Sequence, residues 1–238
     1  MRVWTVLSTE KEYEQLMKTG YLVTDHLDPE CMANTDLQFS CSYDWLSKKL
    51  REKTSSWKYF IYRWYYSISK LVYPRWVWYQ VEGSKNPLDI DITFWSHRSG
   101  QYRFIFFDID PNLILLSDYD LWHYCLNNWY LCNNEGEELQ WEKYIEQFDI
   151  DIFKLKDINY LDSLTKEQSN NAKIIQQKII GSWDNIFDLT NEDEFVHCKN
   201  NEKTIQGVTW VLRKKDITFI KPFTITQDDI DRYEKQFE

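Results

Sequence analysis

Short apolar runs mark the opening of the chain, where a strand, a helix and a second strand are predicted. Val3–Leu7 and Tyr21–Val23 are apolar and β-prone, and the segment between them carries apolar residues at helical spacing. Thr9 with Glu12 has the spacing of a capping box, which would begin this helix, and Gly20 is a typical helix end.

A polar segment and a long aromatic segment follow. Leu27–Asp44 has scattered apolar positions and is predicted to be a loop, and Trp45–Leu71 is predicted to form one or two helices that end before Pro74. Large apolar residues that alternate or run together then predict strands at Trp76–Val81, Ile90–Trp95, Tyr102–Ile109 and Leu113–Leu116.

The next part of the chain begins with a helix signal. Ser117 with Asp120 again has capping-box spacing, so a helix is predicted over Asp118–Leu131. The remaining predicted elements are helices at Glu137–Phe148 and Lys166–Ile180 closed by Gly181, strands at Ile205–Leu212 and Ile217–Pro222, and a terminal helix capped by Thr226 with Asp229.

These elements predict an α+β fold with a mixed, mostly antiparallel sheet, flanking helices and a helical elaboration. The length of 238 residues and the 43% hydrophobic content are sufficient for a substantial core. We expect a single domain over residues 1–238, in which residues 132–181 form a helical insertion.

Aromatic residues make up 17% of the chain, including 12 Trp and 16 Tyr. Two interpretations stay open. The rings fill the core, where they bury a large area, or they form a stacking surface for a base or a nicotinamide. The net charge of −10 argues against general capture of nucleic acid, because phosphate binding relies on clustered Lys and Arg.

One segment has the opposite charge. Lys48–Arg75 contains eight Lys and Arg residues against a single glutamate, and aromatic residues interleave with the basic ones. This composition is typical of a groove for single-stranded nucleic acid. The favoured alternative is an amphipathic helix whose basic side chains cover apolar surface.

The cysteines and the N-terminal sequence predict a reduced, cytoplasmic protein. The five cysteines form no CxxC pair, and an odd number leaves one thiol outside any disulfide scheme. MRVWTVLSTEKE lacks the apolar core of a signal peptide, and no apolar run has the length of a membrane span. We therefore expect neither export nor a membrane partner.

Carboxylates and histidines give little support to a metal site. Two acidic pairs, Asp108 with Asp110 and Asp118 with Asp120, have the ligand type that hard cations prefer, but the second pair is better explained by helix capping. His26, His97, His123 and His197 show no zinc-binding spacing, so no metal is expected. His123 is the best single candidate for acid or base chemistry, although a buried, hydrogen-bonded role is the alternative.

Five blocks of the sequence resemble one uncharacterised bacterial family, the domain of unknown function 3841. The block WHYCLNNWYL is the most specific of them, and the blocks follow the family order. They are VWTVLSTEKEYEQLMKTGYL, Tyr73–Gln80, Leu115–Leu131, Ser182–Leu189 and Thr204–Phe223. The chain departs from the family pattern at Lys49–Lys70, which is longer and more basic and aromatic.

A more distant resemblance links the chain to ADP-ribosyltransferase-like proteins. The opening strand, helix and turn are similar to the first segment of those proteins, and IQGVTWVLRKKDITFI is similar to their late strand with a Gln/Glu-x-Glu motif. Gln206 takes the first position of that motif, the second falls on Val208, and Trp4 with Thr5 stands where Arg or His is usual.

This resemblance implies NAD as the cofactor and one cleft for both cofactor and catalysis. The implied catalytic residues are Gln206, His123 and Thr5, and the implied cofactor-binding residues are Trp4, Trp78, Tyr79 and Trp122. Val208 cannot stabilise an oxocarbenium-like state as a glutamate does.

Three functions stay open at this point. The first is a nucleotide-dependent transferase of the ADP-ribosyl type, as in a toxin or phage-conflict effector. The second is a binding module whose aromatic cleft holds a nucleotide, a nucleic-acid end or a peptide without chemistry. The third is an interaction protein whose tryptophans form its core. The protein or nucleic-acid target is not predicted.

Overall fold

The computed structural model describes residues 1–7, 10–24, 37–54, 73–95, 98–193, 199 and 201–235. The chain divides into two compact units. Unit 1 comprises Met1–Leu27, Ser47–Leu116 and Thr204–Glu238, and unit 2 comprises Asp28–Leu46 and Ser117–Lys203. The expected helical insertion, residues 132–181, lies entirely within unit 2. The expectation that residues 1–238 form a single domain stays a prediction.

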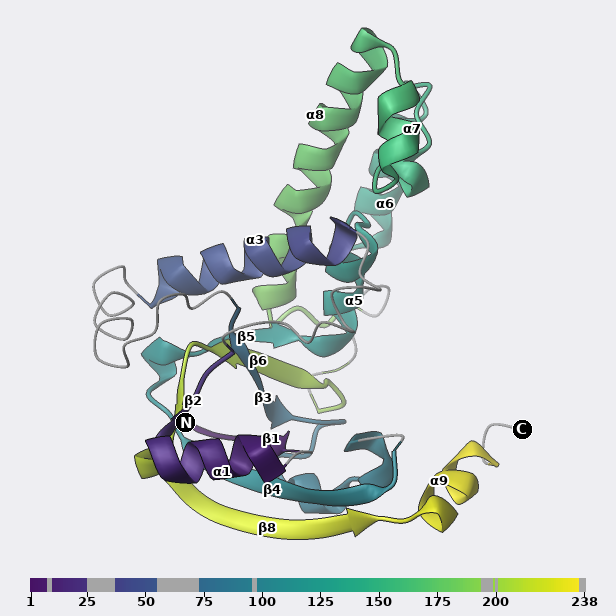
Figure 1. The fold of residues 1–238 in the computed structure, drawn as a ribbon. Helices are drawn as coiled ribbons and strands as arrows, with labels where there is room; N and C mark the ends of the chain where they lie inside the picture. The colour runs from purple at the N-terminus through teal and green to yellow at the C-terminus, as the bar shows by residue number, and fades with distance from the viewer. Residues whose placement is uncertain are drawn as a thin grey trace. The chain divides into compact units, whose positions relative to one another are not determined.

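Unit 1 is built on a six-stranded sheet with the strand order β5-β6-β3-β1-β4-β8 (Figure 1). The neighbouring pairs β1–β3, β1–β4, β3–β6 and β4–β8 are antiparallel. The strands are β1 (Arg2–Leu7), β3 (Arg75–Gln80), β4 (Gly100–Asp108), β5 (Leu115–Asp118), β6 (Ile205–Thr209) and β8 (Ile217–Ile225). A separate two-stranded sheet pairs β2 (Tyr21–Leu22) with β7 (Leu212–Arg213). The predicted α+β class with a mostly antiparallel sheet is confirmed.

Alternate side chains of a strand reach opposite sides of the sheet, and in the central strands both sets are buried. One side, the α1 face, includes Val3, Val77 and Ile105, and Leu16 of α1 (Glu10–Thr19) packs in the same core. The predicted helix is thereby confirmed, and Gly20 ends it with a φ of +86°.

The opposite side of the sheet, the aromatic face, is defined by Trp4, Trp78, Phe104 and Phe106. Two short elements pack against this part of unit 1. They are the 3-10 helix η2 (Ile92–Trp95) and the terminal helix α9 (Gln227–Glu234), which contact each other. Thr226 caps α9 through a capping box with Asp229, as predicted.

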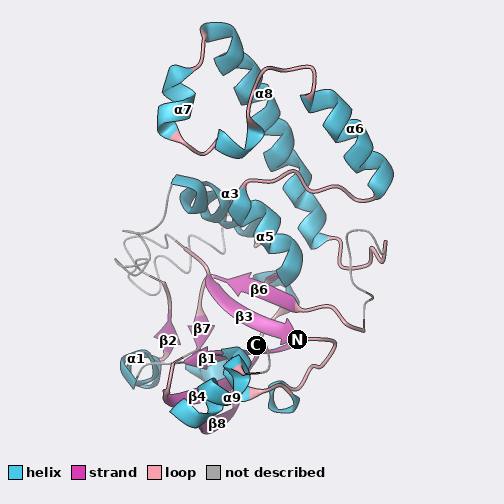
Figure 2. Ribbon diagram, turned by 90° about the vertical axis from the view of Figure 1, so that its right-hand side faces the viewer, coloured by secondary structure: helices cyan, strands magenta, loops and turns pink. Residues whose placement is uncertain are grey.

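Unit 2 is helical within the described residues, and Figure 2 shows its helices in cyan. Its elements are the first part of α3 (Leu37–Lys53), α5 (Tyr119–Asn127), α6 (Glu135–Ile145), α7 (Ile158–Ser163), α8 (Lys166–Ser182) and the 3-10 helices η4 (Ile152–Lys154) and η5 (Trp183–Phe187). Trp183 is fully buried, and its ring meets that of Trp45 edge to face at 5.5 Å between centroids. Trp45 also stacks on Phe187 at 5.5 Å.

The prediction of a loop over Leu27–Asp44 was wrong for its described part. Leu37–Lys53 is one continuous helix. Ser42, Leu46 and Leu50 recur four residues apart and are all fully buried, so they form one buried stripe on this helix. The stripe was missed because a serine takes one of its positions.

The prediction of a strand at Ile90–Trp95 was also wrong, because this segment contains the 3-10 helix η2 and is preceded by η1 (Pro87–Asp89). Asn86 caps η1 by accepting a hydrogen bond from the Leu88 amide. The Asp91 carboxylate accepts hydrogen bonds from the Thr93 amide at 2.9 Å and the Thr93 hydroxyl at 2.6 Å. These local bonds favour turns over an extended strand.

Other predicted boundaries shift by a few residues. Asp118, not Ser117, caps α5 by accepting from the Asp120 and Leu121 amides, and the helix ends before Asn128, which has a φ of 57°. Helix α8 continues through Gly181 to Ser182. The late strand predicted at Ile205–Leu212 is split into β6 and β7.

Candidate functional site

Three of the predicted site residues lie in one row across the sheet. Trp78 of β3 is directly opposite Trp4 of β1 and directly opposite Gln206 of β6. Side chains of directly opposed residues point to the same side of a sheet, so all three belong to the aromatic face. The row continues to Phe106 of β4, which is opposite Trp4.

Two residues of this row, and a third residue packed beside it, bury nitrogen atoms that lack hydrogen-bond partners among the described residues. These atoms are Trp4 Nε1, Gln206 Nε2 and Trp95 Nε1. The rings of Trp95 and Trp78 meet edge to face at 5.7 Å between centroids. Trp78 is therefore the common neighbour of three buried donors, and each unmet donor costs about 1–3 kcal/mol.

Helix η2 supplies the rings that pack on the aromatic face. Phe94 contacts Trp78 at 5.7 Å, Trp95 contacts Phe104 at 5.3 Å, and the two η2 rings contact each other at 5.0 Å. These contacts are edge to face, the arrangement that aromatic quadrupoles favour.

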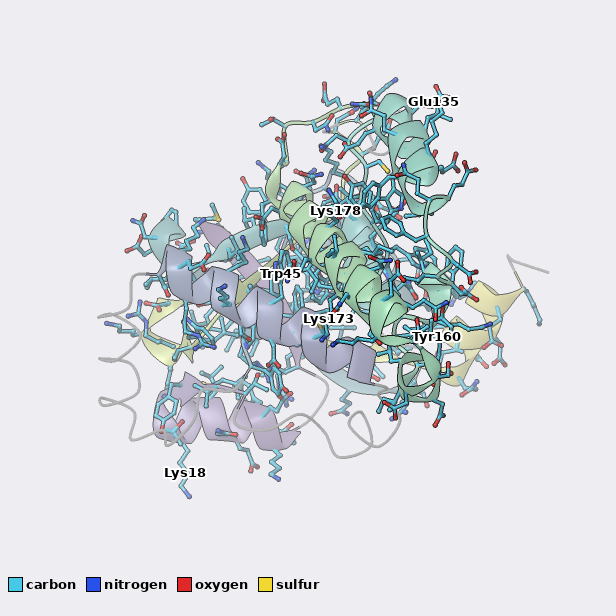
Figure 3. All side chains as sticks on the ribbon, turned by 90° about the horizontal axis from the view of Figure 1, so that it is seen from above. Lys18, Trp45, Glu135, Tyr160, Lys173 and Lys178 are labelled. Atoms are coloured by element: carbon cyan, nitrogen blue, oxygen red, sulfur yellow. The ribbon has the colours of Figure 1, made fainter. Side chains whose placement is uncertain are left out.

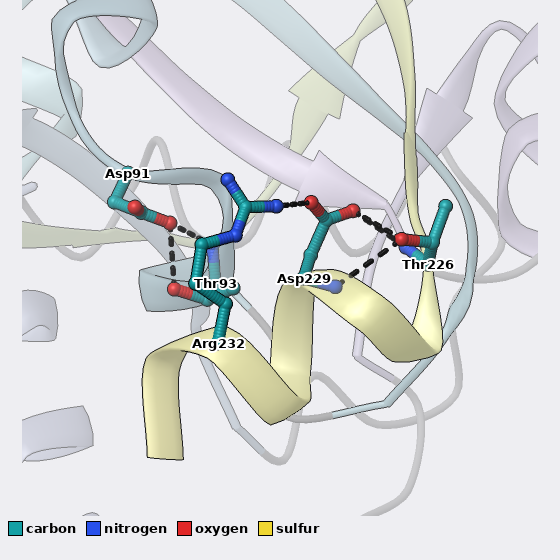
Figure 4. A network of polar contacts seen from close by, with 5 residues as sticks. All are labelled: Asp91, Thr93, Thr226, Asp229 and Arg232. Atoms are coloured by element: carbon teal, nitrogen blue, oxygen red, sulfur yellow. Dashed lines mark hydrogen bonds and ion pairs between the residues drawn. The ribbon is translucent and has the colours of Figure 1, made fainter. Parts of the chain in front are cut away.

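A polar network lies at the junction of η2 and α9 (Figure 4). Asp229 accepts hydrogen bonds from the Thr226 amide at 2.9 Å and the Thr226 hydroxyl at 2.7 Å, and it pairs with Arg232. Hydrogen bonds from Thr93, assisted by the Arg232 charge, hold the pKa of Asp91 below its usual value. Asp91, Thr93, Asp229 and Arg232 line a cavity of about 240 Å³.

Thr5 and Tyr79 lie on the other side of the sheet. Each follows a residue of the row by one position, and successive side chains of a strand alternate between faces. Tyr79 packs against the core of the α1 face, and the Lys85 ammonium lies 4.8 Å from the centroid of its ring. Thr5 is buried, and its hydroxyl donates to the Trp76 carbonyl at 3.4 Å. Their roles stay predictions.

Trp122 and His123 belong to unit 2, on α5. Trp122 is buried, and its ring meets Tyr43 edge to face at 5.7 Å. His123 is exposed, so its interpretation as a buried histidine was wrong. Its Nδ1 atom lies 3.1 Å from the Tyr119 carbonyl oxygen, within the same helix. The other three histidines, His26, His97 and His197, lie outside the described residues.

One member of each candidate acidic pair serves as a cap. Asp118 caps α5, and Asp110 caps the 3-10 helix η3 (Pro111–Leu113) by accepting from the Asn112 amide. Across the described ranges, no three His, Cys, Asp or Glu side chains gather where a metal ion could bind. The absence of a metal stays a prediction.

Three cysteines lie in the described residues, and all three are free thiols. They are Cys41, Cys125 and Cys132. Burial raises the pKa of Cys125, and burial together with the nearby Glu137 raises the pKa of Cys132 to about 11. Cys31 and Cys198 lie outside the described part of the chain.

The basic and aromatic segment Lys48–Arg75 is described only at its ends, because residues 55–72 lie outside the described ranges. Its first basic residues, up to Lys53, are on α3. Arg75 begins β3 and pairs with Glu12 at 2.8 Å. A nucleic-acid groove in this segment stays a prediction.

Sequence reasoning gave no role to Trp95, because it lies in a segment that was predicted to be a strand. The abundance of tryptophan was the single signal that could have indicated it. A pocket in unit 2, lined by residues that include Lys156 and Lys173, was missed as well. Its residues come from separate segments with no motif spacing.

Comparison with known proteins gives a family and no chemistry. No curated protein and no solved structure gives a significant match to this chain. In the part of the chain that is described, no helix has the length and apolar character needed to cross a membrane. The model of one family, Domain of unknown function (DUF3841), matches residues 2–218, and the chain belongs to that family.

Proposed function

We propose that unit 1 binds a ligand with a flat ring and acceptor oxygens at the aromatic face, and that this ligand is NAD or a related nucleotide. The observation that carries the proposal is the set of three buried N–H donors around Trp78. An indole nitrogen can only donate, so Trp4 and Trp95 can be satisfied only by acceptor atoms.

The chemistry of the site fits a nicotinamide. A nicotinamide has a flat ring that can pack among indoles, and its carboxamide oxygen can accept a hydrogen bond from Gln206 or an indole N–H. Gln206 is also the position that the resemblance to ADP-ribosyltransferase-like proteins singles out. Its neighbour on the same face, Val208, is fully buried and apolar, so this strand supplies no acid beside the donor.

The three nitrogens are covered, and Phe94 and Trp95 of η2 pack on the face that holds them. A ligand therefore reaches the donors when η2 moves. Since η2 contacts α9, binding should also shift α9. This access step predicts association well below the diffusion limit.

A thermal-shift titration with NAD, nicotinamide and ADP-ribose tests the proposal, because a ligand that binds the folded state raises the unfolding midpoint. Gln206→Met removes the amide and keeps a similar shape. Because Gln206 Nε2 makes no hydrogen bond with the described residues, this variant should be as stable as the unchanged protein. It should nevertheless lose the ligand-dependent shift.

Thr5→Val is the matched control on the opposite face of the same sheet, and it should keep the shift. If NAD, nicotinamide and ADP-ribose leave the midpoint unchanged at millimolar concentration, the proposal is wrong and the rings are core. If Gln206→Met and Thr5→Val respond alike, the ligand does not lie on the aromatic face. A shift with short oligonucleotides or peptides instead of NAD would identify the face as a different binding module.

The second candidate is ADP-ribosyl transfer, as in a toxin or phage-conflict effector. The adjacency of β6, β3 and β1 favours it, because this order brings Gln206 beside Trp4 through Trp78. In that reaction the bond between nicotinamide and ribose breaks, nicotinamide leaves, and a nucleophile of the target takes the ribose and releases its proton. Gln206 would be the catalytic residue in unit 1, with Trp4 and Trp78 at the cofactor.

Release of nicotinamide from NAD, measured by chromatography, separates the two candidates. A transferase releases nicotinamide when a cell extract supplies the target, and Gln206→Met should slow the release. A binding module shifts the thermal midpoint and releases none.

A further inference from the structure

Unit 2 contains a pocket of about 420 Å³ that no part of the proposed function uses. This volume is within the range of small-molecule sites, roughly 300–1,000 Å³. Its lining comes from the end of α5, from α3, α7 and α8, and from the segments on either side of α7. Every lining residue belongs to unit 2.

The wall of the pocket is mostly apolar. Leu155, Ile158, Leu161, Leu164 and Ala172 supply the apolar surface. Ile158 and Leu161 are 52% and 37% exposed, so apolar side chains of α7 stand open to solvent beside the pocket. An exposed apolar wall around a cavity is a feature of ligand sites.

The polar side chains of the pocket differ in whether they already have partners in the protein. Asn128 and Gln176 satisfy each other through two side-chain hydrogen bonds, of 3.0 Å and 2.5 Å. Lys156 and Lys173 are exposed, and neither forms an ion pair with any described residue. Lys154, by contrast, pairs with Asp151 at 3.0 Å.

The charges around the pocket favour a negatively charged ligand. No aspartate or glutamate is among its described lining residues, although the whole chain carries a net charge of −10. Lys173 projects from α8, and Figure 3 labels it there. Two ammonium groups that have no ion-pair partner among the described residues, beside an apolar cavity, match an anionic head attached to an aliphatic tail.

We propose that this pocket binds a medium-chain aliphatic carboxylate, with the chain against Leu155, Leu161 and Leu164 and the carboxylate between Lys156 and Lys173. Cys41 also lines the pocket and is half-buried. A bound chain would therefore shield the Cys41 thiol from alkylating reagents.

Calorimetric titration of the full chain with hexanoate, octanoate and decanoate tests the pocket. Affinity should rise about fourfold for each added methylene, which corresponds to ~0.8 kcal/mol, until the chain fills the cavity. Alkylammonium ions of the same lengths should bind about tenfold or more weakly, because the lysines repel them. Equal binding of both head groups, or no binding by any carboxylate, overturns the proposal without the use of a variant.

The variants locate the site. The double variant Lys156→Met and Lys173→Met keeps two apolar stems and removes both charges, so carboxylate affinity should fall about tenfold. Lys143→Met with Lys166→Met is the matched control, because both lysines are exposed, lie in unit 2 and are outside the pocket lining. An equal loss in this control would show that net charge, not the pocket, attracts the anion.

Ser169→Leu fills the cavity from its wall. Ser169 is half-buried, and the hydrogen bond that its backbone N–H donates to the Thr165 carbonyl does not depend on its side chain. This variant should abolish binding of decanoate and remove its protection of Cys41. Unchanged decanoate binding in a folded Ser169→Leu protein would place the ligand elsewhere.

Discussion

Gly207 and Ile114 approach so closely that a Cβ atom on residue 207 would lie 2.8 Å from the Ile114 Cδ1 atom. Leu116 would be equally close, at 2.9 Å. A real Cβ essentially never has such neighbours, so the absence of a side chain lets these residues pack against the α1 face of β6.

Gly207→Ala should therefore lower the free energy of unfolding by about 1–3 kcal/mol, because both neighbours must shift. Gly181→Ala is the matched control. Nothing lies within 4 Å of its Cβ position, and it is inside a helix, so the change should raise stability by roughly 0.5–1 kcal/mol. Urea denaturation measures both, and a neutral Gly207→Ala would show that the two side chains re-pack freely.

Gln176→Met should destabilise unit 2 by about 1–3 kcal/mol, because the buried Asn128 amide loses both hydrogen bonds to Gln176. Gln177→Met, at the exposed neighbouring position, should have almost no effect. Thermal unfolding of the two variants makes the comparison. Equal midpoints would mean that other groups form hydrogen bonds with the Asn128 amide in place of Gln176.

Cys132 should react slowly in the folded protein. Its pKa of about 11 leaves little thiolate at pH 9, so alkylation there should be on the order of 50-fold slower than for a thiol with a pKa of 9. Because the raised pKa belongs to the folded state, its contribution to stability is present below pH 9.0 and is lost as pH rises through about 11. Mass spectrometry of the alkylated peptides measures the rate, and rapid labelling at pH 9 would contradict the prediction.

Acid should weaken the turns at the starts of η2 and α9. Hydrogen bonds from Thr226 lower the pKa of Asp229, and hydrogen bonds from Thr93 lower the pKa of Asp91. A lowered folded pKa stabilises the fold above the ordinary value of 3.8, and this stabilisation is lost as pH falls through the lower folded value.

Proton titration of the side-chain carboxyl signals by NMR measures these pKa values. Asp229→Asn should shift the acid transition of the α9 signals upward in pH, since the cap then lacks its charge. Asp228→Asn, in the same first turn, is the control and should leave the transition in place. A common response of both variants would argue for a general charge effect.

Elements with a strong local signal were predictable from the sequence, and elements fixed by distant packing were not. The Thr226 and Asp229 capping box defines the start of α9 by itself. The stripe of α3, in contrast, includes a serine whose hydroxyl donates to the Cys125 carbonyl at 2.6 Å, a partner far along the chain. Hydrophobic spacing cannot reveal such a position.

The candidate site shows the same division. The importance of Trp4, Trp78 and Gln206 was predicted from resemblance, but their alignment depends on the register between β1, β3 and β6. Register sets which side chains share a face of the sheet. Thr5 and Tyr79 lie on the side opposite the aromatic face. Trp95 packs beside Trp78 because the hydrogen bonds between Asp91 and Thr93 bend its segment into a turn.

The split of unit 2 into two chain segments has a consequence for the order of events during synthesis. Trp45 emerges early, whereas its ring partners Trp183 and Phe187 emerge after all of residues 47–116 have been made. Until then the Trp45 ring has no native cover from those partners. The nascent chain must therefore keep this ring from other apolar partners through most of translation, and unit 1, whose residues Thr204–Glu238 are made last, should be the later of the two to complete its native core.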